Sequence, residues 1–292
     1  MPRARSRSAR DPFDWARFRS GLATGLTAAI TLGLVLGVVL GRGALKARAA
    51  QSHALPVRAA FNWPTVVGPG DADAPTTWLD DQTRARLQHI VQTTVTPDPF
   101  DAGSLQRAQR ALMATGWFSG PCTLRRDRDG LVRVDCRWRV PYAAVRHADR
   151  DHLVTIRGEL LDRSFEPGLV RLWVIQGAAS GPPAPGEPWP GGQVQAALEL
   201  ITFLHRSGAT APALRGVDVS AFTPTGRQLV LITTAGARIV WGGPASAPNP
   251  GEERSAVKLR NLSTVLAKPD QAAAPGLVFD VRFARPGWLA AP

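Results

Sequence analysis

The sequence contains few of the residues that build common catalytic and metal centres. Among 292 residues there are two cysteines, three lysines and five histidines, at positions 53, 89, 147, 152 and 205. Two cysteines cannot complete a zinc site, and the histidines show no ligand spacing. The chain also lacks a Gly-x-Ser-x-Gly motif, a phosphate-binding loop and a dinucleotide fingerprint. We therefore predict no metal, no cofactor and no catalytic residue.

One catalytic pattern is present and is rejected. Ser255-Ala256-Val257-Lys258 matches Ser-x-x-Lys, the nucleophile pattern of penicillin-binding proteins. A pattern with two fixed positions arises easily by chance, and none of the three lysines begins the companion Lys-Thr-Gly motif. The neighbouring apolar residues have helical spacing, so we interpret Lys258 as a solvated helix residue.

The sequence has a single long apolar run, from Ser20 to Gly41, and it carries no charge. As a helix it would extend roughly 33 Å, enough to cross a hydrocarbon core of about 30 Å. Six arginines precede it, which favours a cytoplasmic tail over residues 1–19 and an extracytoplasmic body. The expectation is a single-pass inner-membrane protein. The alternative is a signal peptide cleaved near Ala47-Arg48-Ala49.

Positive charge is concentrated at the N-terminus. The net charge is +12, and residues 1–48 account for nine cations and two anions. The remaining residues carry 26 cations and 21 anions, so their charges nearly cancel and a nucleic-acid partner is not expected.

The two cysteines can be placed by counting along a predicted hairpin. If Asp127 faces Leu131 across a three-residue loop, then Cys122 faces Cys136 at a non-hydrogen-bonded position, where side chains are closest. A disulfide would form there in an oxidising compartment. Two free core cysteines in a reducing compartment are the alternative.

The order of predicted elements indicates an α+β chain with two folded regions after a linker at 42–60. The first, residues 61–139, has the order strand, helix, helix, strand, strand, with Thr77 and Asp80 as a capping box before the first helix. The second, residues 140–288, is a mixed sheet with flanking helices. Its predicted strands cover parts of 140–162, then 217–222, 228–234, 237–241 and 277–283, and its helices cover about 194–206 and 252–267.

Several short motifs in this order resemble those of one family, the FtsQ/DivIB bacterial cell-division proteins. The segments that carry the resemblance are Arg137–Ala143, Leu153–Leu161, Leu229–Gly242, Lys258–Leu262 and Phe279–Phe283. They depart from the family pattern at Val140, Thr155 and Arg157, and an acidic residue is missing before Val140. The resemblance spans nearly the whole chain.

The resemblance implies a POTRA domain at 61–139 and an FtsQ-like β domain at 140–288, behind a transmembrane helix at 20–41. It implies a non-catalytic bitopic scaffold at mid-cell. Its partners would be FtsB-like and FtsL-like division proteins and the septal peptidoglycan synthase. Docking would occur by strand addition to an exposed edge, at residues Leu277, Val278, Phe279, Asp280, Val281, Arg282 and Phe283, with Lys258 and Arg260 nearby.

Two other classes of protein remain as alternatives. One is an envelope enzyme such as a peptidoglycan hydrolase, which would show a pocket with convergent Asp, Glu or His residues. The other is a POTRA protein of secretion or outer-membrane assembly, which predicts a long series of barrel strands that the sequence does not contain.

Overall fold

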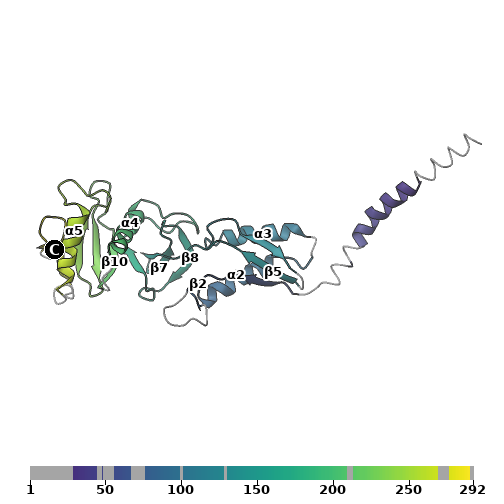
Figure 1. The fold of residues 1–292 in the computed structure, drawn as a ribbon, viewed down its shortest axis with the longest axis horizontal. Coiled ribbons are helices and arrows are strands. Elements are labelled where there is room, and N and C mark those ends of the chain that lie inside the picture. Colours follow the sequence, from purple (N-terminus) through teal and green to yellow (C-terminus); the bar gives the residue numbers. More distant parts are fainter. Residues whose placement is uncertain are drawn as a thin grey trace, which may run out of the picture. The chain divides into compact units, whose positions relative to one another are not determined.

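The computed structural model describes residues 29–44, 48, 56–66, 76–98, 101–127, 130–208, 213–268 and 276–289 (Figure 1). Contacts divide the chain into two compact units. The first contains a helix over residues 29–44, and the second contains the strands and the helices α2 to α5. The second unit is an α+β fold with mixed sheets.

The expected transmembrane helix at 20–41 is not found. None of the helices in the described ranges is both long enough and apolar enough to cross a membrane. The helix over residues 29–44 measures about 24 Å at 1.5 Å per residue, against a hydrocarbon core of about 30 Å. Residues 20–28 of the predicted span lie outside the described residues. The placement in the inner membrane depended on this helix and was also wrong.

The smaller sheet has the strand order β1-β5-β4. The strands are β1 (Arg58–Phe61), β4 (Thr123–Arg126) and β5 (Leu131–Asp135); β1 runs parallel and β4 antiparallel to β5. The predicted first strand, 61–67, was misplaced. The ladder with β5 ends at Phe61, and a two-residue pair, β2 (Thr65–Val66) with β3 (Thr76–Thr77), follows Pro64. Proline lacks the N–H that a continuous ladder needs.

Two helices pack on the smaller sheet, α2 (Asp81–Thr94) and α3 (Ala102–Met113). Asp80, not Thr77, caps α2, because its carboxylate accepts the Thr83 N–H at 2.9 Å. Thr77 lies further upstream, where its hydroxyl accepts the Leu79 N–H. The apolar faces of both helices enter one core with the sheet, formed by residues that include Leu87, Val91, Ala108, Leu112, Trp117, Phe118, Val132 and Val134.

The β4–β5 hairpin has the register expected from the sequence. Asp127 donates its N–H to the Leu131 carbonyl at 2.8 Å, and Thr123 lies opposite Asp135. Counting outward by one residue places Cys122 opposite Cys136, and the two are joined by a disulfide bond.

The larger sheet has nine strands in the order β14-β13-β12-β11-β10-β9-β6-β7-β8. Its strands are β6 (Ala143–His147), β7 (Arg150–Val154), β8 (Leu160–Phe165), β9 (Trp173–Gln176), β10 (Leu214–Asp218), β11 (Leu229–Thr233), β12 (Arg238–Gly242), β13 (Val278–Asp280) and β14 (Gly287–Leu289). The β6–β9, β9–β10 and β12–β13 pairs are parallel, and the other pairs are antiparallel.

Two of these parallel pairs are connected by helices. Helix α4 (Gln193–Arg206) joins β9 to β10, and α5 (Ser255–Leu266) joins β12 to β13 (Figure 1). Both helices share one core with alternate residues of the strands, so they cover the same face of the sheet. This core contains Val145, Ile175, Val217, Leu231, Ile239, Trp241 and Phe279 from the sheet, and Ile201, Leu204 and Leu262 from the helices.

The two sheets pack against each other within the second unit. Ala144, Leu153 and Leu161 of the larger sheet belong to the core of the smaller one. Around this contact, Arg86 pairs with Asp162 at 2.7 Å and Arg163 with Asp80 at 3.4 Å, so β8 is held against α2. The segments that precede and follow residue 140 therefore share a core.

We expect the disulfide to contribute measurably to stability. It closes a short loop, with a sequence separation of 14. Replacing both Cys122 and Cys136 by Ala should lower the free energy of unfolding in urea by about 2–4 kcal/mol, because the unfolded chain regains the freedom that the bond removes. Adding a thiol reductant to the wild-type protein should give a similar shift. An unfolding midpoint that does not respond to the reductant would contradict this expectation.

Candidate functional site: the C-terminal sheet edge

One end of the larger sheet, β8, is covered by other parts of the chain. Leu160 donates its N–H to the Glu187 carbonyl at 2.9 Å and accepts the Gly186 N–H at 2.7 Å. Glu159 forms a bridge with Pro188, and the side chains of Asp162 and Arg163 contact α2. The outer side of β8 is therefore occupied at its start by residues 186–188.

The other end of the sheet, β14, has a partner on one side within the described residues. It pairs with β13, with Val278 opposite Leu289 and Asp280 opposite Gly287. The Leu277 carbonyl and the Val281 N–H bond to β12, and backbone groups alternate in direction along a strand. The backbone N–H and carbonyl groups of Val278 and Asp280 therefore face β14, where Leu289 and Gly287 lie opposite them.

The same alternation gives the direction of the middle residue of β14. If the backbones of Gly287 and Leu289 face β13, the N–H and carbonyl of Trp288 face away from the sheet. No strand among the described residues pairs with this side of β14, so these two groups form an edge of the nine-stranded sheet. Such an edge is a template for a further strand.

The prediction of an exposed edge over 277–283 was wrong. Within this segment, β13 has β12 on one side and β14 on the other. Past the strand, the Arg282 carbonyl accepts the Glu253 N–H at 2.8 Å, and the Phe283 carbonyl accepts the Asn261 side-chain amide at 2.6 Å. The backbone of 277–283 is thus used inside the domain.

The side chains of this segment also differ from the expectation. Phe279, Asp280 and Val281 are buried, and Leu277, Val278 and Arg282 are half-buried; Phe283 is 49 % exposed. Asp280 accepts the Arg282 N–H at 3.0 Å, which ends β13 in a turn, and pairs with the Arg282 guanidinium at 2.7 Å. This pairing raises the pKa of Arg282 despite partial burial. Phe283 is the member of the set that offers a large apolar surface.

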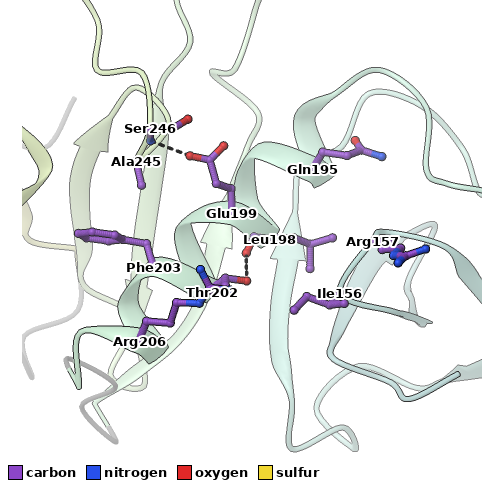
Figure 2. A pocket seen from close by; sticks show the side chains of 10 residues that line it. All are labelled: Ile156, Arg157, Gln195, Leu198, Glu199, Thr202, Phe203, Arg206, Ala245 and Ser246. Atoms are coloured by element: carbon purple, nitrogen blue, oxygen red, sulfur yellow. Dashed lines mark hydrogen bonds between the residues drawn. The ribbon is translucent and has the colours of Figure 1, made fainter.

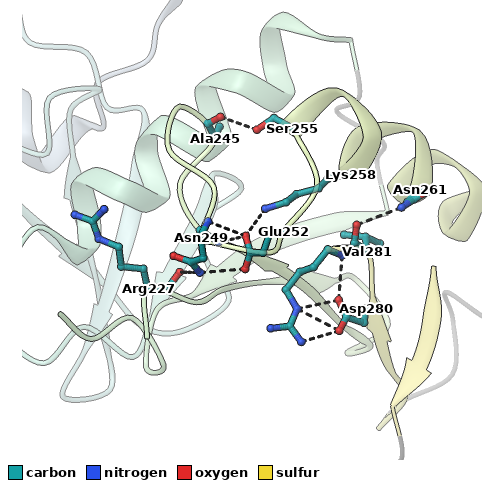
Figure 3. Close-up of polar contacts among 11 residues, drawn as sticks. Arg227, Ala245, Asn249, Glu252, Ser255, Lys258, Asn261, Asp280 and Val281 are labelled. Atoms are coloured by element: carbon teal, nitrogen blue, oxygen red, sulfur yellow. Dashed lines mark hydrogen bonds and ion pairs between the residues drawn. The ribbon is translucent and has the colours of Figure 1, made fainter. Parts of the chain in front are cut away.

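Lys258 was expected to be solvated and to lie near the docking edge, but it is buried and is not accessible to a partner protein. Its side chain is fully buried, with Nζ 2.6 Å from Glu252 Oε2 (Figure 3). The same atom lies 5.5 Å from the centre of the Trp241 ring. Ser255 donates its hydroxyl to the Ala245 carbonyl at 2.6 Å, so the two residues of the Ser-x-x-Lys pattern have separate structural partners. Arg260, two residues further along α5, is exposed.

Glu252 connects α5 to the loop that follows β12. Its carboxylate accepts the N–H groups of Gly243 and Asn249, at 2.9 and 3.2 Å, and the Asn249 side-chain amide at 3.0 Å. A Cβ atom at Gly242 would overlap this carboxylate, and the φ of +88° at Gly242 also requires glycine. Burial alone would raise the pKa of Glu252, but the bonds from Lys258, Gly243 and Asn249 outweigh burial and lower it.

Two more Arg–Asp pairs lie on the sheet strands. Arg238 on β12 pairs with Asp218 on β10 at 2.7 Å, and Arg146 on β6 pairs with Asp151 on β7 at 2.8 Å. Burial raises the pKa of Asp218, but hydrogen bonds from Ser220 and Arg238 lower it below its ordinary value. Within the described ranges, no three His, Cys, Asp or Glu side chains are grouped to hold a metal ion.

Sequence reasoning missed β14. A three-residue strand is too short for its alternation to be recognised, and the preceding Pro286 points to a turn. The one available signal was Gly287-Trp288-Leu289, an aromatic and an aliphatic residue after a turn. That signal does not say on which side the strand would pair.

Comparison of the chain with protein-family models found no match, and comparison with curated proteins found none. The proposed function therefore rests on the geometry of the β14 edge and on the contacts of Glu252, Lys258 and Asn261 that hold the neighbouring segments.

We expect Lys258→Met to destabilise the protein strongly. It would leave the buried Glu252 carboxylate without its cation, and breaking a buried pair in this way costs about 3–5 kcal/mol. Arg260→Met is the matched control on the same helix. Because Arg260 is exposed, the control should remain within about 0.5 kcal/mol of the wild-type free energy of unfolding. Equal losses for the two variants in urea titrations would contradict the assignment.

The lowered pKa of Glu252 predicts an acid-sensitive stability. The unfolded chain takes up a proton at this residue near its ordinary pKa of 4.5, whereas the folded protein does so only at lower pH. The contribution of Glu252 to the free energy of unfolding is therefore fully present above pH 4.5, and it is lost as the pH falls through the pKa of Glu252 in the folded protein. Glu252→Gln should reduce the slope of unfolding free energy against pH below 4.5. Parallel slopes for the wild-type protein and the Glu252→Gln variant would contradict the role given to this carboxylate.

Proposed function

We propose that this chain is a non-catalytic scaffold that binds an extended segment of a partner protein along β14. The observation that carries the proposal is the arrangement of the last two strands. β13 is paired on both sides, and β14 presents the Trp288 N–H and carbonyl outward. Binding by strand addition uses such backbone groups for affinity and neighbouring side chains for specificity.

The surroundings of β14 favour a partner segment with apolar residues. Phe283 is half exposed and lies under the Arg282 guanidinium, whose carbon is 5.2 Å from the ring centre. Since β14 has three residues, its backbone alone offers few hydrogen bonds to a partner. A large apolar contact near Phe283 would supply the additional affinity.

For the biological role, we propose a scaffold of the FtsQ/DivIB type in bacterial cell division. The proposed partners are FtsB-like and FtsL-like proteins and, through them, the septal peptidoglycan synthase. Two motifs behind the resemblance support this assignment, because the glycine that ends Leu229–Gly242 and the lysine that begins Lys258–Leu262 meet at Glu252. Residues of separate motifs thus serve one structural purpose, the support of the β14 edge.

The test removes the outward N–H of β14. Trp288→Pro deletes this donor without removing a bond to β13, whereas Trp288→Thr changes the side chain and keeps the donor. With the FtsB-like protein of the same genome, the Pro variant should bind at least tenfold more weakly than the Thr variant by calorimetry. In the wild-type protein, the Trp288 amide should become protected from hydrogen exchange when this partner is added.

Two results would contradict the proposal. One is equal affinity of the Pro and Thr variants, which would exclude a role for the backbone of β14. The other is an unchanged exchange rate at the Trp288 amide in the saturated complex. Circular dichroism of each variant gives the control for folding.

A further inference from the structure

A groove of about 450 Å³ lies on the outer side of α4, on the larger sheet's helical layer (Figure 2). Helix α4 forms its floor. Ile156 and Arg157, from the turn between β7 and β8, lie on one side of the helix, and Ala245 and Ser246, from the loop after β12, lie on the other. The size is within the range of concave ligand-binding sites.

The floor is a single stripe of α4. Its lining residues are Gln195, Leu198, Glu199, Thr202, Phe203 and Arg206. They recur every three or four residues over about three helical turns, or roughly 16 Å. Other faces of α4 carry Val194, Ala197, Ile201 and Leu204 into the core. The helix therefore has one face committed to the sheet and a second, partly apolar face toward solvent.

The groove is apolar at its centre and along one wall. Leu198 is buried at its base, and Phe203 is half-buried beside it. Ile156 is 53 % exposed, which is high for a large aliphatic side chain at the end of a buried strand. The turn that carries Ile156 lies close to α4, because a Cβ atom at Gly158 would be 3.2 Å from Gln195 Nε2 and 3.4 Å from Leu198 Cδ1. The Gly158 carbonyl accepts the Trp189 N–H at 2.9 Å, which also holds the turn. The apolar wall is thus part of a packed turn.

The rim of the groove is positively charged. Figure 2 shows Arg157 and Arg206 at opposite ends, and both are exposed. Neither has an acidic partner within 4.0 Å among the described side chains. The one carboxylate of the groove, on Glu199, is used internally and accepts the Ser246 N–H at 2.7 Å. This neutral donor leaves the Glu199 charge in place, so the lining carries one negative charge near its middle and a positive charge at each end.

Segments of the chain that lie outside the structure do not match this surface. Residues 1–28 contain six arginines and two aspartates and would be repelled by the rim. Residues 67–75, 269–275 and 290–292 contain three aspartates but a single side chain of the leucine or valine type, Val67, which is too little for the apolar centre of the groove. The complementary occupant is a segment of another protein.

We propose that this groove binds an amphipathic helix of a partner protein, with leucine-type side chains on one face and Asp or Glu near both ends. A floor three turns long with an apolar centre is suited to the helix-in-groove mode, in which apolar anchors recur at i, i+3, i+4 and i+7. Acidic residues near both ends would pair with Arg157 and Arg206. This surface is separate from β14, so it provides a second docking site that does not depend on the proposed strand addition.

The experiment is a selection of binding peptides from a random 14-residue display library on the immobilised full chain. The expected consensus has apolar residues at helical spacing between acidic ones. Affinities of the selected peptides are then measured by fluorescence anisotropy. Arg157→Glu/Arg206→Glu should weaken binding at least fivefold, and Ile156→Glu at least tenfold, since each removes a contact on the rim or wall. Trp288→Pro should leave the affinity unchanged.

The matched control is Arg125→Glu/Arg137→Glu, which makes the same change in charge at exposed sites of the smaller sheet region. It should bind the peptides like the wild type. Equal weakening by the control, peptides without acidic residues, or no dependence on Arg157, Arg206 and Ile156 would each overturn the proposal. So would binding to phosphatidylglycerol vesicles through the same arginines with no peptide selected, because that result assigns the groove to a lipid surface. Circular dichroism confirms that every variant is folded.

Discussion

The buried ion pair between Lys258 and Glu252 is the interaction on which the C-terminal part of the structure depends. Glu252 holds the loop after β12 through Gly243 and Asn249, and Lys258 ties that loop to α5. One turn further along α5, Asn261 donates to the carbonyls of Val281 and Phe283 and so fixes the chain between β13 and β14. The position of the sheet edge therefore rests on a charge pair from which water is excluded, and the neighbouring hydrogen bonds offset the cost of desolvating it.

The same support explains how β14 is held in place although it makes few contacts of its own. β14 is short and has a partner on one side, which by itself would make it a weakly held element. Its neighbour β13 is anchored by the buried side chains of Phe279 and Val281 and by the Asp280–Arg282 turn. At the opposite end of the sheet, the outer side of β8 is occupied by residues 186–188 and by α2. One end of the sheet is thus covered, whereas no described residue covers the outer side of β14 at the other end. This difference is the basis of the proposed strand addition.

Local parts of the fold followed from the sequence. The β4–β5 register came from counting around one turn, and the amphipathic pattern of Gln193–Arg206 gave the helix and its buried face. Two other expectations were wrong. A helix expected at 20–41 is represented in the described residues by a shorter one at 29–44, and the clear alternation of 277–283 produced a strand of three residues, because the Asp280–Arg282 contact turns the chain.

The sequence by itself determined the features that depend on neighbouring residues. These are the helical faces, the hairpin register, and the turns that glycine and aspartate permit. These depend on the 3.6-residue and two-residue periods of the backbone and need no knowledge of distant partners. Among the described residues, only the tertiary structure decided which strand ends the sheet, which lysine is buried, and which face of α4 stays outside the core. Each of these depends on contacts between segments that are not neighbours in the chain. β14 belongs to the large sheet because β13 pairs with β12 across the whole of α5, and Lys258 is buried beside Trp241 of β12.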